Sequence, residues 1–140
     1  QSWSMTSPEK IKRVDWVMGA FLMAKKEVFD QIGGLDKDIF MYMEEVEWCY
    51  RAKENNKHIF FYPNAKIIHL GGGSSKTGRT GPILYIYQGL VYFYKKHKPT
   101  WQKILIKLML KIKAGLAYLI GTINNNSYLK KTYEQAWQLV

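Results

Sequence analysis

The run TWQKILIKLMLKIKAGLAYLIGTI, residues 100–123, predicts a long helix that begins directly after Pro99. It is apolar around most of its circumference, and Lys103, Lys107 and Lys111 form one narrow stripe at four-residue spacing. Its charge-free part, 114–123, has ten residues, whereas a membrane span needs about twenty. We therefore expect a helix that lies in a membrane interface, with its lysines towards anionic headgroups. The alternative is an amphipathic helix packed on another domain or on a partner chain.

The excess of positive over negative residues lies in the second half of the chain. The formal net charge is +10; residues 1–70 hold ten Lys/Arg and ten Asp/Glu, whereas residues 71–140 hold eleven Lys/Arg and one acid, Glu134. Such a surface attracts phosphate, nucleic acid or an acidic membrane. No nucleic-acid fold signature accompanies the charge, so we expect no nucleic-acid partner.

Composition predicts a folded chain in a reducing compartment. The 140 residues are 47% hydrophobic, which is enough for a core. The one cysteine, Cys49, cannot form an internal disulfide or a cysteine metal site. We expect a cytosolic setting.

The hydrophobic periodicity predicts an α/β chain with more helix than strand. The expected helices cover residues 25–34, 41–55, 83–97 and 101–123, with a short last helix after 124–127, and the expected strands cover 58–63 and 65–70. Residues 14–24 are expected to be buried and extended, with an interruption at Gly19. The segment GGGSSKTGRTG, residues 71–81, is expected to be a loop.

The stretch FMYMEEVEWCYR, residues 40–51, places three carboxylates in four positions. On a helical wheel four charged residues fall on one side and predict a solvated, ion-paired face: Glu44, Glu47, Arg51 and Glu54. Glu45 instead falls in the apolar arc, beside Trp48 and Cys49. Partial burial there would raise the pKa of Glu45 towards the range useful for a general base. The alternative is a carboxylate satisfied by backbone N–H groups as a helix cap.

Five elements in order give the chain a family resemblance. They are the Trp-x-x-Gly-Ala segment, the Gly-Gly-x-Asp turn, the acidic pair, the Tyr-Pro-x-Ala strand and the His-x-x-Gly-Gly-x-Ser loop, within VDWVMGAFLMAKKEVFDQIGGLDKDIFMYMEEVEWCYR and IFFYPNAKIIHLGGGSS. Over about residues 11–98 the chain resembles the second half of family 2 glycosyltransferases, in particular the rhamnosyltransferase-like branch that builds bacterial surface polysaccharides. The resemblance implies the C-terminal, acceptor-side part of a GT-A mixed-sheet fold, with added C-terminal helices.

The resemblance also implies a catalytic role for the acidic pair. In the family this pair, usually Glu-Asp, supplies the base that deprotonates the acceptor hydroxyl, and the matching residue is Glu45. Glutamate in place of aspartate extends the reach of the base by about a bond length. Glu44 and Glu47 match neighbouring acidic positions and are expected to support the base.

Further residues match the substrate-binding parts of the family. Trp16, Gly19 and Ala20 match the segment that lines the acceptor side, although Trp16 would alternatively be a core residue. His69 matches a histidine near the diphosphate and metal, and its alternative is a hydrogen-bonded structural residue. The 71–81 loop offers groups that would fold over a diphosphate, unless it is a plain surface loop: Ser74, Ser75, Lys76 and Arg79.

The nucleotide-binding features of the family are not found in this sequence. Family members carry an N-terminal half with an Asp-x-Asp motif for the metal of the sugar nucleotide, and nothing here matches it. We expect residues 1–98 to be the acceptor-side half of the enzyme, residues 99–140 to be a basic amphipathic tail, and a divalent metal, Mg²⁺ or Mn²⁺, to be shared with the N-terminal half. The isolated fragment is expected to be inactive, and an exposed sheet edge makes a dimer conceivable.

The predicted function is inverting transfer of a sugar from a nucleotide-sugar donor to a saccharide or lipid-linked acceptor in surface polysaccharide synthesis. The predicted location is the cytoplasmic face of the cell membrane, as a peripheral protein. The alternative is a non-catalytic, membrane-associated module that binds a carbohydrate or a partner.

Overall fold

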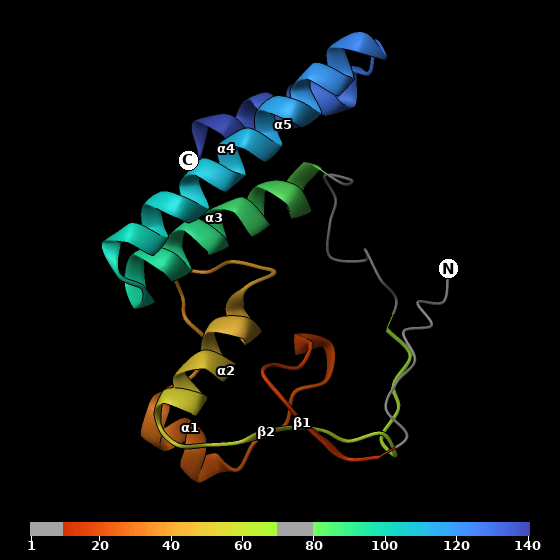
Figure 1. Ribbon diagram of the computed structural model, residues 1–140. Helices are drawn as coiled ribbons and strands as arrows, with labels where there is room; N and C mark the ends of the chain where they lie inside the picture. The colour runs from red at the N-terminus through yellow and green to blue at the C-terminus, as the bar shows by residue number, and fades with distance from the viewer. Residues whose placement is uncertain (1–9, 70–79) are drawn as a thin grey trace. The chain divides into compact units, whose positions relative to one another are not determined.

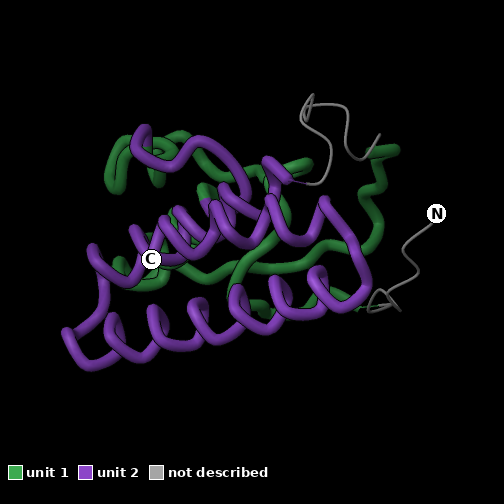
Figure 2. The backbone as a smooth tube through the Cα atoms, turned by 90° about the horizontal axis from the view of Figure 1, so that it is seen from above, with its two compact units in different colours: residues 1–36, 44–70 green, residues 37–43, 71–140 purple. Residues whose placement is uncertain are grey.

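The structure is a computed structural model that describes residues 10–69 and 80–140, and it is mixed α/β and mostly helical (Figure 1). The chain divides into two compact units (Figure 2). Unit 1 comprises residues 1–36 and 44–70, and unit 2 comprises residues 37–43 and 71–140. The predicted boundary between residues 98 and 99 stays a prediction.

The sheet of unit 1 has two antiparallel strands, β1 (Lys12–Val14) and β2 (Ile59–Phe61). Its register pairs Lys12 with Phe61 and Val14 with Ile59. β-Branched and aromatic residues favour this pleated, half-buried arrangement. The ladder joins two segments that are far apart in the sequence, and so fixes the segment before residue 19 against the rest of unit 1.

Two helices build the apolar core of unit 1, α1 (Lys26–Ile32) and α2 (Glu44–Glu54). Trp48, Cys49 and Ala52 of α2 are buried, and partly buried side chains of α1 pack against them. The rings of Phe29 and Trp48 lie 4.8 Å apart between centroids. The four-residue spacing of the apolar positions on each helix brings these faces together.

Side chains of α2 hold the carboxyl end of α1. The Arg51 guanidinium donates from Nη1 to the carbonyl of Ile32 and from Nη2 to that of Gly34, the latter at 2.6 Å. The Trp48 indole Nε1–H donates to the carbonyl of Gly33 at 2.8 Å. The last carbonyls of a helix have no partner within it, so α2 supplies the missing donors. Gly33 ends α1 with a φ of 80°, a left-handed conformation that favours glycine.

The prediction that Glu47 lies on a solvated face of α2 is wrong. The predicted ion pair with Arg51 is present, with Nε of Arg51 at 2.8 Å from one carboxylate oxygen of Glu47 and 3.0 Å from the other. The Glu47 side chain, however, is 0% exposed. The helical wheel could not indicate this burial, because it counts only the helix itself and not what packs against it.

Unit 2 contains three helices among its described residues, α3 (Thr80–His97), α4 (Thr100–Ile123) and α5 (Ser127–Gln138). Their shared core consists of Tyr87, Leu110, Ala114 and Ala136, ringed by partly buried apolar side chains. Burial raises the pKa of Tyr87 to about 12. Its hydroxyl therefore stays protonated at neutral pH and donates to the carbonyl of Leu110 at 3.3 Å.

Helices α4 and α5 approach closely because one residue has no side chain. A Cβ added at Gly121 would lie 2.8 Å from the Cβ of Leu129 and 3.0 Å from the backbone nitrogen of Lys130. The turn between the helices ends at Asn126, whose side chain accepts a hydrogen bond from the backbone of Leu129 at 3.1 Å. This is a helix N-cap, and it starts α5.

The structure confirms the predicted helices and corrects part of the predicted strands. All five helices occur near their predicted positions, and the first strand of the expected pair is β2. The predicted strand over 65–70 is wrong for residues 65–69, which form no ladder with any described strand. The predicted interruption of residues 14–24 is confirmed as a 3-10 turn at Gly19–Phe21, flanked by extended residues. The predicted burial is wrong for Met18, Phe21 and Met23, which are exposed. Val17, Leu22 and Ala24 are partly buried against the core of unit 1. Short apolar runs predict strands only weakly, because a strand needs a partner to pair with. The GT-A mixed sheet stays a prediction.

Candidate functional site

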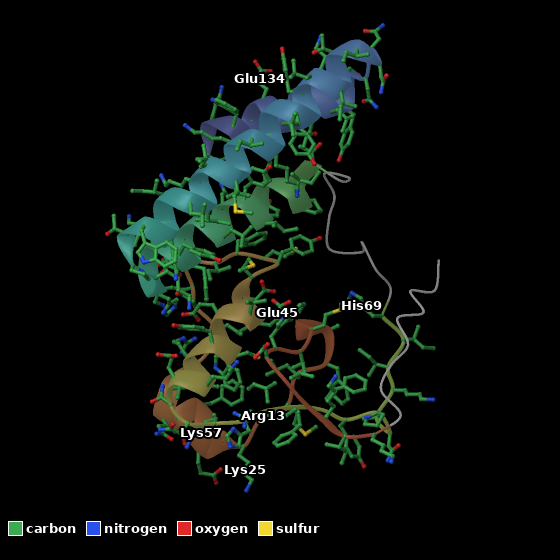
Figure 3. All side chains as sticks on the ribbon, viewed as in Figure 1. Arg13, Lys25, Glu45, Lys57, His69 and Glu134 are labelled. Carbon is green, nitrogen blue, oxygen red and sulfur yellow. The ribbon has the colours of Figure 1, made fainter. Side chains whose placement is uncertain are left out.

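Glu45 is the unusual carboxylate of unit 1. It lies in the first turn of α2 (Figure 3). Its exposed fraction is 8%. Its Oε2 atom is buried and has no hydrogen-bond partner among the described residues. A buried acceptor without a donor is costly, so it marks a position where a donor from a ligand would be accommodated.

The segment from residue 17 to residue 19 runs along the face of α2 that carries Glu45. The backbone of Gly19 hydrogen-bonds the Glu45 carboxylate, and the backbone of Val17 hydrogen-bonds the Cys49 thiol. A Cβ added at Gly19 would lie 3.6 Å from the Cβ of Glu45 and 3.8 Å from its Cδ. Two residues of extended chain span about the length of one helical turn, so Val17 and Gly19 match Cys49 and Glu45 in register.

Burial raises the pKa of Glu45 above its ordinary value. Hydrogen bonds from its own backbone N–H and from that of Gly19 oppose the increase, and the nearby charge of Glu44 adds to it. Glu45 therefore does accept backbone N–H groups, as the capping alternative required. That alternative leaves Oε2 unexplained, because a cap would satisfy the carboxylate and not bury one oxygen without a partner.

The other two acidic residues of α2 differ from Glu45 in their surroundings. Glu44 is partly exposed and acts on Glu45 through its charge and through a side-chain hydrogen bond. Glu47 accepts a hydrogen bond from Arg51, and the same guanidinium donates to the carbonyl of Ile32 at the carboxyl end of α1. Glu47 therefore belongs to the contacts that join α2 to α1, and its support of the base stays a prediction.

The predicted acceptor-side residues lie on or next to the 3-10 turn. Gly19 is in contact with Glu45, and Ala20 follows it as an exposed residue. Trp16 is 48% exposed, so it is not the buried core residue of the alternative interpretation. An exposed indole ring suits a sugar, which presents C–H faces to aromatic surfaces.

His69 is exposed and lies at the end of the described part of unit 1 (Figure 3). No described hydrogen bond joins it to Glu45. Within residues 10–69 and 80–140, no group of three or more His, Cys, Asp or Glu side chains is placed to hold a metal ion. The described residues therefore do not by themselves fit a Mg²⁺ or Mn²⁺ site, and the metal and the role of His69 stay predictions. The loop residues Ser74, Ser75, Lys76 and Arg79 lie outside the described residues.

Sequence reasoning missed the role of Arg51 and Trp48 in holding α1. Two features of the sequence could have indicated this contact. Arg51 and Trp48 are hydrogen-bond donors close to Glu47 in the sequence, and the Gly-Gly pair ends a helix whose last carbonyls need donors. They could be used only with knowledge of how α1 and α2 pack.

Together these features define a site in which a buried carboxylate contacts a glycine backbone, with an exposed indole three residues before that glycine in the chain. Such an arrangement suits proton transfer to or from a sugar hydroxyl.

Curated glycosyltransferases match part of the chain. A 49-residue stretch is 47% identical to the low-salt glycan biosynthesis hexosyltransferase Agl10 of Haloferax volcanii and covers 35% of this chain and 16% of that protein. A 66-residue stretch is 35% identical to the N-acetylglucosaminyl-diphospho-decaprenol L-rhamnosyltransferase of Mycobacterium tuberculosis and covers 47% of this chain and 21% of that protein. A 56-residue stretch is 30% identical to rhamnosyltransferase WbbL of Escherichia coli and covers 40% of this chain and 21% of that protein.

Over these stretches the chain is therefore similar to curated hexosyl- and rhamnosyltransferases. The matched stretches span about a fifth or less of the length of the curated relatives. No family model matches the chain, and no solved structure matches it significantly.

Proposed function

We propose that this chain is the acceptor-side part of an inverting glycosyltransferase of the GT-A type, with Glu45 as the base. The similarity to curated rhamnosyl- and hexosyltransferases supports glycosyl transfer in general. The observation that carries the assignment of the base is the buried, unpartnered Oε2 of Glu45.

In the proposed reaction, the acceptor hydroxyl donates a hydrogen bond to the Glu45 carboxylate. Its oxygen attacks the anomeric carbon of the donor sugar while the proton moves to the carboxylate. The bond from the anomeric carbon to the phosphate oxygen breaks, and the nucleoside diphosphate leaves. One displacement inverts the anomeric configuration, and a general base contributes about 10²–10⁴-fold to such a step.

Desolvation supports Glu45 in this role. Because burial raises its pKa, the carboxylate is a stronger base than an exposed glutamate and takes up a proton more readily. Gly19 keeps the side of Glu45 open, since any side chain beyond Cβ at that position would extend towards the carboxylate. Trp16 offers the aromatic surface on which an acceptor sugar ring would rest.

We further propose that the donor is a nucleotide-sugar and that the acceptor is a saccharide or a lipid-linked saccharide. The curated relative from Mycobacterium tuberculosis is named for a diphospho-decaprenol-linked acceptor, which supports the lipid-linked form. A divalent metal, cytoplasmic location and dimerisation remain predictions, and no step above depends on them.

The test measures kcat for glycosyl transfer by the natural protein that carries this chain. The wild type is compared with the Glu45→Gln variant and with the Glu54→Gln variant. Glu54 ends the same helix, is exposed and lies away from the carboxylate contacts, so it is a matched control. We expect Glu45→Gln to lower kcat by about 10²–10⁴-fold and Glu54→Gln to leave it unchanged. Equal turnover by wild type and Glu45→Gln would remove the base assignment. Absence of transfer by the wild-type protein, together with carbohydrate binding, would favour the non-catalytic module instead.

A further inference from the structure

Helix α4 carries a continuous apolar stripe on its exposed side. The stripe, here called the α4 apolar face, consists of Ile104, Leu108, Ile112, Leu116, Leu119 and Ile123. Each of these side chains is between 53% and 82% exposed. Their spacing of three or four residues keeps them on one side of the helix along nearly its whole length.

The opposite side of α4 is already used for packing within unit 2. Leu110, Ala114 and Gly121 are buried there, against α3 and α5. The helix therefore has two apolar sides, and the described residues of unit 2 cover only one of them. Monomeric soluble proteins rarely expose contiguous apolar patches of this kind, so the second side indicates an interaction surface.

Lysines line both edges of the α4 apolar face. Taking Ile112 as its centre, Lys111 and Lys113 lie about 100° to either side on the helix. Lys107 lies about 140° away, and its Nζ donates to the carbonyl of Val140 at 3.1 Å. The Nζ of Lys111 lies 5.5 Å from the ring centroid of Trp137, and the Nζ of Lys113 lies 5.9 Å from that of Tyr87. These aromatic contacts hold the ammonium groups beside the apolar stripe and not across it.

The surrounding charge selects among possible occupants. Residues 80–140 contain nine lysines and one acid, Glu134. Two copies of such a surface would repel each other, whereas an anionic surface would be attracted. A shallow groove of about 430 Å³ on the same helix has five apolar lining residues, with Lys113 as the sixth, which combines an apolar floor with a cation at its edge. No described helix is long and apolar enough to cross a membrane.

We propose that the α4 apolar face lies in the interface of an anionic lipid bilayer. The 24 residues of α4 make a rod of about 36 Å, and this rod would lie parallel to the membrane plane. The stripe would enter the boundary between headgroups and acyl chains, and Lys111 and Lys113 would reach the phosphates at its edges. This inference is independent of the role of Glu45 and of glycosyl transfer.

The test is co-sedimentation of the 140-residue chain with lipid vesicles. One vesicle type contains only phosphatidylcholine, and the other contains added phosphatidylglycerol. We expect stronger binding to the anionic vesicles, and weaker binding as the salt concentration rises, because salt screens the lysines. Circular dichroism of each variant checks that its helices are retained.

A triple variant and a double variant separate the apolar and the electrostatic contributions. Leu108→Ser, Ile112→Ser and Leu119→Ser together should lower the vesicle partition coefficient by about a hundredfold or more. Lys111→Gln and Lys113→Gln together should lower it on anionic vesicles by about fivefold per lysine and leave the weak binding to phosphatidylcholine unchanged.

The matched control removes three exposed apolar side chains of unit 1, with Ile11→Ser, Met23→Ser and Ile68→Ser. These are 59%, 82% and 92% exposed, so the control tests whether any exposed apolar group would serve, and we expect it to bind as wild type does. Three outcomes would overturn the proposal. They are no vesicle binding by the wild type, equal loss in the control variant, or a dimer in light scattering that the Leu108, Ile112 and Leu119 variant dissociates without any effect of lipid.

Discussion

Replacement of Arg51 by methionine tests how α2 is fixed in unit 1. The substitution keeps most of the apolar stem and removes the guanidinium. It deletes the two contacts to the Glu47 carboxylate, at 2.8 and 3.0 Å, and the donors to the carbonyls of Ile32 and Gly34. The carboxylate of Glu47, which is 0% exposed, then lacks its arginine partner.

The expected loss follows from the burial of this pair. Removing one partner of a buried ion pair costs about 3–5 kcal/mol, because the remaining charge stays desolvated. Arg51 is 20% exposed, so water can reach part of the site, and we expect a loss near the lower end, about 3 kcal/mol. Total domain stability is about 5–15 kcal/mol, which makes this loss a large fraction of it.

Urea unfolding of the 140-residue chain, followed by circular dichroism, measures the loss. Lys26→Met is the matched control, because Lys26 and Asp30 form another four-residue ion pair whose side chains are 82% and 60% exposed. Exposed pairs contribute little, so we expect this control to unfold as wild type does. The double variant Glu47→Gln with Arg51→Met should regain part of the loss. A loss below about 1 kcal/mol for Arg51→Met would refute the reasoning and restore a solvated Glu47.

Two further substitutions test the packing of unit 2 and the charge of Glu45 by the same urea unfolding. Gly121→Ala should destabilise unit 2 by about 1–3 kcal/mol, because the new Cβ would lie 2.8 Å from the Cβ of Leu129; an unchanged free energy of unfolding would contradict the close approach of α4 and α5. Because the pKa of Glu45 is raised in the folded state, its protonated form stabilises the fold at low pH, and this stability is lost as the pH rises through the raised pKa. The free energy of unfolding of Glu45→Gln, relative to wild type, should therefore increase by about 1–3 kcal/mol between pH 4 and pH 8, and a constant difference would show that burial does not perturb this carboxylate.

The helices were predictable from sequence because their apolar residues recur with a clear helical period and end at recognisable signals. Gly33 follows α1, and Pro99 precedes α4. The strand predicted after Pro63 failed because its apolar residues had no described partner strand, and a periodic pattern cannot supply one.

The candidate site was only partly predictable for a related reason. The wheel placed Glu45 in the apolar arc, and the structure buries it. The same wheel placed Glu47 on a solvated face, although its carboxylate is 0% exposed and accepts from Arg51, whose guanidinium also donates to the end of α1. Contact between Gly19 and Glu45 depends on the path of the chain between β1 and α1, which local sequence patterns do not determine.

The pH dependence of kcat/KM in the natural protein tests the central claim, that Glu45 is the base, most directly. A base acts only when deprotonated, so activity should fall as the pH decreases through the raised pKa of Glu45, at a pH above the ordinary glutamate value of 4.5. We expect this acidic limb to disappear in Glu45→Gln, with a low residual activity that is independent of pH over the same range. An acidic limb that persists unchanged in Glu45→Gln would contradict the account, because another group would then be the base.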